Sequence, residues 1–286
     1  MSAEDALREI LLCCLDQFQG NYKSVLAGQV EGVHQMRVGI RRLRSCLYVY
    51  RALIPKEITS LIGDETRWLN EALGPVRDLD VFMEGLEDVL AAFPDRLGLV
   101  RTRGRCRAER DRRREELVKR LTSARYHRMV LTSAEWINNR GWNRDLDSER
   151  RDALREPVSH HARRVLARLY KQMRRDGKHF ETLSAVEKHA LRIRVKRLRY
   201  GLQFFNGLYP RKHLRPIASA LGDLQDDLGV LNDMYVADAL LDSVGIRTGS
   251  ARALLDGWYG SRAAGQEAHA TVAWQQFVKA PVPWER

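Results

Sequence analysis

Eight basic side chains recur at helical spacing in two segments of this chain. They are His34, Arg37, Arg41 and Arg44 in the first segment, and His189, Arg192, Lys196 and Arg199 in the second. At about 100° per residue, steps of three and four residues place each set on a helix stripe about 80° wide. A row of such groups binds anion oxygens, and arginine does so through two parallel hydrogen bonds to phosphate. The spacing therefore indicates a surface that binds a polyanion.

Each basic stripe lies beside an apolar stripe of the same helix, and not opposite it. The apolar residues are Val33, Met36, Ile40, Leu43 and Leu47 in the first segment, and Leu191, Val195, Leu198 and Leu202 in the second. Because an apolar stripe faces the core, the basic stripe is expected to line a groove next to that core. A charged run is usually a solvated helix face, which stays the alternative for either segment alone. Arg42 and Arg197 are predicted to lie elsewhere around the two helices.

The two segments are copies of one sequence unit. H-Q-M-R-V-G-I-R-R-L-R begins at His34 and H-A-L-R-I-R-V-K-R-L-R begins at His189, an offset of 155 residues without a gap. The same offset aligns L-G-P-V-R-D-L-D-V at 73–81 with L-G-V-L-N-D-M-Y-V at 228–236. Such self-similarity predicts two structural halves that repeat one helical unit.

Helical periodicity extends over most of the chain, and no run of alternating apolar residues predicts a strand. Helices are predicted at 6–18, 34–55, 58–73, 76–92, 101–128, 162–173, 189–210, 213–228, 230–244 and 251–277. Pro55 and Pro210 are expected to end the two basic helices. Gly74 and Gly229 mark either a break between helices or a close approach of two helices. The predicted fold class is therefore all-α.

The repeated motifs resemble the CHAD family, the conserved histidine alpha-helical domain. The similarity extends from about residue 5 to about residue 245, and includes the L-R-I-R-x-K-R-L-R-Y and L-G-x-L-N-D segments. It implies two four-helix-bundle-like halves related by internal pseudo-twofold symmetry, which we place at 1–145 and 146–286. It also implies binding of inorganic polyphosphate in a basic channel between the halves, by a module without known catalytic activity.

The composition limits the kind of partner and the environment. A formal net charge of +12 favours an anionic partner without choosing among nucleic acid, a membrane surface and polyphosphate. The cysteines Cys13, Cys14, Cys46 and Cys106 show no paired spacing, which is typical of reduced thiols in a cytoplasmic protein. The acidic N-terminus predicts no signal peptide, and the longest apolar run, 10–15, is too short to span a bilayer.

The eight basic residues are the predicted polyphosphate-binding site, and neither a cofactor nor a metal ion is expected. His34 and His189 leave three alternatives open, namely phosphate contact, a structural hydrogen bond, or, with few ligands nearby, metal binding. Asp78 and Asp233 occupy equivalent positions in the two copies. They are either general bases or, as the favoured interpretation, partners that orient arginines. Residues 101–128 carry twelve Lys and Arg against four Asp and Glu, which predicts either an outer basic ramp or a surface of local ion pairs.

The leading hypothesis from the sequence is a non-catalytic protein that binds long-chain inorganic polyphosphate. The expected location is the cytoplasm, with association to polyphosphate granules, and no membrane partner is expected. The main alternative is nucleic-acid binding in the same groove, although the stripes hold no aromatic residue for base stacking. A metal-dependent phosphohydrolase is a weaker alternative, because no nucleotide-binding loop and no H-E-x-x-H or G-x-S-x-G motif occurs.

Overall fold

The computed structural model describes residues 1–94 and 96–285, which fold into α-helices and short 3₁₀ turns without a strand. The α-helices are α1 Ala3–Gly20, α2 Tyr22–Leu26, α3 Val30–Val49, α4 Lys56–Ala92, α5 Leu97–Leu121, α6 Ala124–Asn138, α7 Ser148–Arg155, α8 Val158–Asp176, α9 Ala185–Phe204, α10 Arg211–Ser243 and α11 Ser250–Lys279. The all-α prediction is confirmed.

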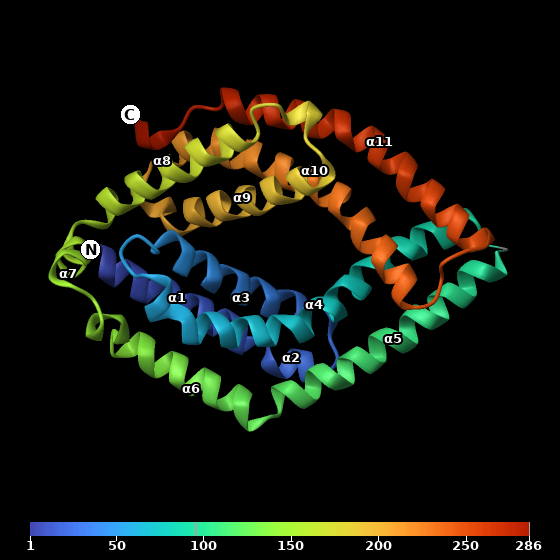
Figure 1. Ribbon diagram of the computed structural model, residues 1–286, viewed down its shortest axis with the longest axis horizontal. Coiled ribbons are helices and arrows are strands. Elements are labelled where there is room, and N and C mark those ends of the chain that lie inside the picture. Colours follow the sequence, from blue (N-terminus) through green and yellow to red (C-terminus); the bar gives the residue numbers. More distant parts are fainter. Residues whose placement is uncertain (95, 286) are drawn as a thin grey trace.

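The two basic helices, α3 and α9, lie side by side near the middle of an elongated molecule (Figure 1). Helix α3 packs against α1 and α4, and α9 packs against α8 and α10, which are the corresponding neighbours in the repeat. Helices α5 and α6 follow one long edge of the molecule, and α11 follows the opposite edge. The pseudo-twofold relation between halves 1–145 and 146–286 stays a prediction.

The basic helices begin and end at positions with clear local causes. Ser184 starts α9 through a capping box, in which its hydroxyl accepts from the backbone N–H of Glu187 and the Glu187 carboxylate accepts from the backbone N–H of Ser184. The prediction that Pro55 and Pro210 end α3 and α9 is wrong, because both helices end several residues earlier. Each proline is instead the N-cap of the next helix, where its missing N–H leaves no hydrogen bond unmade.

Helix α4 continues through Gly74 and Pro75, and α10 continues through Gly229, so the predicted breaks are absent. Leu73 and Val76 on either side of the Gly74–Pro75 pair are both buried. Their burial keeps the apolar face of α4 unbroken, and tertiary packing therefore overrides the weak helix propensity of glycine and proline. Two long helices consequently form uninterrupted walls beside α3 and α9.

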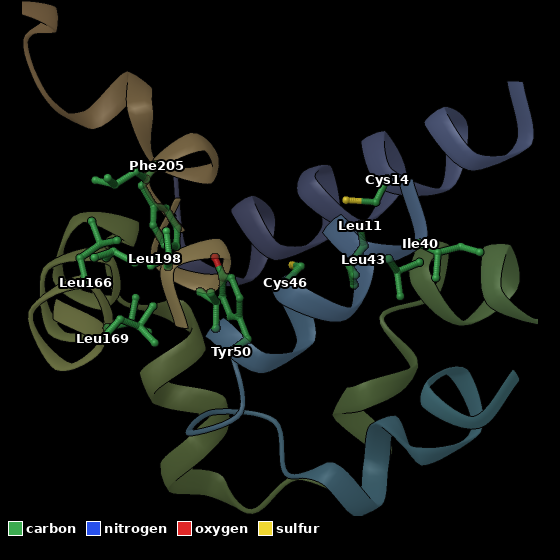
Figure 2. Packing of buried hydrophobic residues seen from close by; sticks show 14 of the residues in the cluster. Leu11, Cys14, Ile40, Leu43, Cys46, Tyr50, Leu166, Leu169, Leu198 and Phe205 are labelled. Carbon is green, nitrogen blue, oxygen red and sulfur yellow. The ribbon is translucent and has the colours of Figure 1, made fainter. Parts of the chain in front are cut away.

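The core that holds α3 and α9 together draws side chains from both halves of the sequence. Leu43 and Tyr50 of the first copy share a buried cluster with Leu166 and Leu198 of the second (Figure 2). A second cluster lies where the C-terminal parts of α4 and α10 meet α5 and α11. This shared packing fixes the relative position of the two basic helices. The division into halves 1–145 and 146–286 stays a prediction from the repeat.

Replacing Gly39 with alanine is expected to lower the free energy of unfolding by about 1 kcal/mol, because α3 approaches α1 closely at this position. A Cβ atom there would lie 2.8 Å from the Cβ and backbone nitrogen of Phe18. Gly104 in α5 is the control, since nothing lies within 4 Å of its Cβ position, and Gly104→Ala should stabilise the protein by up to about 1 kcal/mol. Thermal unfolding followed by circular dichroism measures both variants, and stabilisation by Gly39→Ala would contradict the close approach.

Candidate functional site

A cavity of about 1200 Å³ lies between α3, α4, α9, α10 and α11. Seven of the eight predicted site residues line it, namely His34, Arg37, Arg41, Arg44, His189, Arg192 and Lys196. The two basic stripes therefore meet around one space and do not point into bulk water on opposite sides. We call Arg37, Arg41, Arg192 and Lys196, which are all half-buried, the inner cluster.

The eighth predicted residue, Arg199, does not line the cavity, and Arg197 lines it instead. The lining positions of α9 are 189, 192, 193, 196 and 197, whereas those of α3 include 34, 37, 40, 41 and 44. The face that borders the cavity is thus rotated on α9 relative to α3, which moves Arg199 out and Arg197 in. Arg42 lies outside the cavity, as predicted, and donates a hydrogen bond to Gln17 of α1.

Further cations line the cavity that the two stripes did not predict. They are Arg51, Lys56, Arg67, Arg77 and Arg262. Lys56 and Arg67 belong to a stripe of lining residues that runs along α4. The spacing of residues in the sequence predicts this stripe only if α4 is treated as one continuous helix. Among the residues that the structure describes, eleven Lys and Arg line the cavity against four Asp and Glu.

Helix α4 holds the innermost arginine of the first copy in place. Nη1 of Arg37 donates to the backbone oxygen of Gly74 at 2.7 Å and to Oδ1 of Asp78 at 3.1 Å. A Cβ atom at position 74 would lie 3.4 Å from the same Nη1, so this glycine marks a close approach and not a break. In the second copy Nη2 of Arg192 lies 4.0 Å from Oδ1 of Asp233. Both aspartates therefore orient arginines, which was the favoured interpretation of their recurrence.

The two histidines have different neighbours. Nδ1 of His189 forms a hydrogen bond of 2.7 Å with Oδ1 of Asn232. Arg77 occupies the position of Asn232 in the first copy, and burial together with this guanidinium lowers the pKa of His34. Within residues 1–94 and 96–285, no group of three or more histidine, cysteine or acidic side chains is arranged to hold a metal ion.

Burial and mutual repulsion both disfavour the positively charged forms of the side chains in the inner cluster. Burial is the main reason why the pKa of Lys196 is lowered to about 7. The positive charges of Arg192, Arg41 and Arg37 add to this lowering, and the carboxylate of Asp233 opposes it. Burial also lowers the pKa of Arg37 and of Arg192. Like charges gathered in a half-buried space destabilise the empty cavity, and a bound anion would offset that cost.

A bound polyanion is expected to make Lys196 take up a proton. Anion contact favours the ammonium form, so the pKa should rise from about 7 towards its ordinary value, and affinity should fall as the pH rises from about 7 to about 10. Titration calorimetry at about pH 8 in buffers of different ionisation enthalpy should detect uptake of close to one proton. Lys196→Arg keeps its charge and should bind without this uptake, and an equal uptake by that variant would contradict the assignment.

The arginine-rich helix α5 has a different charge environment. Arg112 and Arg113 both donate to Glu109, and Arg112 also pairs with Glu116. Hydrogen bonds from Arg112 and Arg113 lower the pKa of Glu109 to about 2. Of the two alternatives for segment 101–128, this part of α5 fits the surface of local ion pairs.

The fold and the cavity define an all-α protein with a central cationic cavity. The chain matches the family model of the CHAD domain over residues 9–242, and it belongs to the CHAD family. Its structure is similar to the crystal structure of the CHAD domain from the plant Ricinus communis, with a TM-score of 0.73 and 28% sequence identity over 100% of this chain and 90% of that chain. PptA from Streptomyces chartreusis shares the fold, with a TM-score of 0.67 and 15% identity over 100% of both chains.

No curated protein matches the chain. In the described part of the chain, every helix is too short or too polar to cross a membrane.

Proposed function

We propose that the central cavity binds inorganic polyphosphate. One observation carries the proposal, namely that most of the lining cations have no carboxylate partner. Within the described residues, Arg41, Arg44, Arg51, Lys56, Arg77, Lys196 and Arg197 line the cavity without forming an ion pair. Unpaired guanidinium and ammonium groups around one space suit a ligand that offers many phosphate oxygens and little else.

Single-stranded nucleic acid fits the cavity less well than polyphosphate does. Its bases need free aromatic faces for stacking. Tyr48 lines the cavity, but the guanidinium groups of Arg51 and Arg197 lie over its ring, at 4.0 and 3.8 Å from the centroid. Phe82 and Tyr259, which also line it, stack on each other at 6.1 Å between centroids. The aromatic rings in the cavity are thus engaged with protein groups.

We also propose that the site binds without catalysis. The two carboxylates nearest the inner cluster, Asp78 and Asp233, face Arg37 and Arg192, so their negative charge is used to orient cations. Neither carboxylate is therefore available as an unpaired general base beside the inner cluster. Binding to insoluble polyphosphate would place the protein on polyphosphate granules, which is the cellular role we propose.

A competition experiment at fixed salt tests the proposed ligand against nucleic acid. The protein is loaded with labelled single-stranded DNA or RNA on a filter, and excess long-chain polyphosphate is added. Complete displacement is expected, because polyphosphate presents a denser row of charges to the same cations. Retention of the nucleic acid under excess polyphosphate would remove polyphosphate as the preferred ligand. Release of orthophosphate on incubation with divalent metal would contradict the absence of catalysis.

A further inference from the structure

A second pocket, of about 430 Å³, lies between α10, α11 and the residues around the start of α9, and we call it the side pocket. It shares part of its wall with the central cavity, because His189 and Asn232 line both spaces. Leu231 and Ala263, in contrast, line the side pocket but not the central cavity. The side pocket is thus a neighbour of the cationic cavity and not a part of it.

The lining of the side pocket is mostly apolar. Leu228 and Leu241 of α10 border it, and both are buried. Three small side chains leave space that longer ones would fill, one each from α9, α10 and α11, namely Ala185, Ala237 and Ala263. Protein interiors are close-packed, and a space among apolar side chains holds water poorly. The side pocket therefore favours an apolar occupant.

The charged groups around the side pocket are paired with one another. Nζ of Lys188 donates to Oε1 of Glu267 at 2.7 Å, which links α9 to α11. Arg252 donates to both of the other lining carboxylates, Asp238 and Asp256. Among the described lining residues, no Lys, Arg, Asp or Glu is left without an ion pair. An uncharged ligand suits this lining best, because a charged one would enter an apolar space without a free partner.

The equivalent positions of the first copy are closed. Tyr235 of α10 is 62% exposed, whereas its counterpart in α4, Asp80, is 8% exposed. Oδ1 of Asp80 lies 3.9 Å from Nη1 of Arg110, so α5 covers this position of α4. Lys188 is half-buried, whereas its counterpart Val33 is fully buried. The opening is therefore no by-product of the repeated architecture, and it results from sequence differences in the second copy.

We propose that the side pocket binds a small, uncharged and mostly apolar organic molecule, of about the size of two fused rings. Its volume of about 430 Å³ falls within the range of pockets that hold small organic ligands, about 300–1000 Å³. The exposed ring of Tyr235 shows that the pocket reaches the surface, where a ligand can enter. The inference goes beyond the proposed function, since polyphosphate needs unpaired cations and this ligand needs none.

The uncharged naphthalene fluorophore Prodan tests the side pocket directly. Its emission moves to shorter wavelength in an apolar site, so the protein is titrated into a fixed, low concentration of Prodan. Saturable binding with a Kd of about 0.1 mM or tighter is expected. The uncharged competitor 2-naphthol should displace Prodan, whereas the anion 2-naphthoate should be at least about tenfold less effective. The absence of a saturable shift, or equal displacement by both competitors, would overturn the proposal.

Two variants that fill the space identify the side pocket as the site of binding. Ala263→Leu and Ala185→Leu add side-chain volume from different helices, and each should weaken Prodan binding at least about tenfold. Ala264→Leu is the matched control, because Ala264 is adjacent in sequence, exposed and outside the pocket, and its affinity should stay within about twofold. Circular dichroism checks the fold of each variant. Unchanged Prodan binding in both filling variants would show that the fluorophore binds elsewhere.

The double variant Arg37→Gln/Arg192→Gln separates the side pocket from the central cavity. Neither arginine lines the side pocket, so Prodan affinity should stay within about twofold. Ala263→Leu should likewise keep its affinity for polyphosphate within about twofold, because Ala263 does not line the central cavity. A loss of Prodan binding of about tenfold in the arginine variant would place the fluorophore in the central cavity and would overturn the proposal.

Discussion

Replacing Arg37 and Arg192 together with glutamate is expected to abolish polyphosphate binding and to leave the helical circular dichroism unchanged. Each arginine is half-buried in the inner cluster and is oriented by an aspartate of the facing helix. Loss of two charge-assisted hydrogen bonds, at about 1.5–3 kcal/mol each, corresponds to a fall in affinity of about 100-fold to about 10⁴-fold. The introduced carboxylates would also lie beside Asp78 and Asp233 and repel the ligand. Filter binding and titration calorimetry measure the loss.

The control for this variant carries the same change of charge at another surface. Arg101 and Arg107 are exposed on α5 and lie outside the cavity. Arg101→Glu/Arg107→Glu should therefore bind polyphosphate within about threefold of the unmodified protein. An equal loss in the control would mean that net charge, and not the cavity, attracts the ligand. Unfolding of Arg37→Glu/Arg192→Glu would favour a structural role for these arginines.

Affinity for long-chain polyphosphate should fall about 10³-fold when monovalent salt is raised from about 50 mM to about 200 mM. The seven lining cations without an ion pair give the number of expected phosphate contacts. At about 0.7 released counterions per contact, the slope of log affinity against log salt is about −5, as for a flexible single-stranded polyanion. Direct titrations at four or more salt concentrations measure it. A slope shallower than about −2 would contradict a site that engages the whole cavity.

The sequence predicted most of the cavity lining on α3 and α9 because these helices are copies, so the same spacing of basic residues occurs twice in the chain. Matching basic positions next to an apolar stripe identified seven lining residues, and the same offset found the aspartates that orient Arg37 and Arg192. Periodicity gives the angle of a residue around its own helix, but not the rotation of that helix against its neighbours. The exchange of Arg199 for Arg197 follows from such a rotation, which core packing sets.

The contribution of α4 was missed for a different reason. Gly74 and Pro75 have low helix propensity, so the sequence favoured two short helices there. Buried residues on both sides keep α4 continuous, and only in a continuous helix do Lys56 and Arg67 share a face with Arg77. Arg51 follows the end of α3, where its counterpart at the repeat offset is Asn206, and Arg262 lies on α11, outside the repeated segments. Tertiary packing was needed to bring both residues to the cavity.

The position of the bound ligand tests the central claim most directly, since basic side chains also lie outside the cavity, for example on the exposed helix α5. A crystal structure of the protein with polyphosphate should show phosphate groups between α3 and α9, within hydrogen-bond distance of Arg37, Arg41, Arg192 and Lys196. Phosphate groups along the outer face of α5, with the space between α3 and α9 free of ligand, would contradict the account.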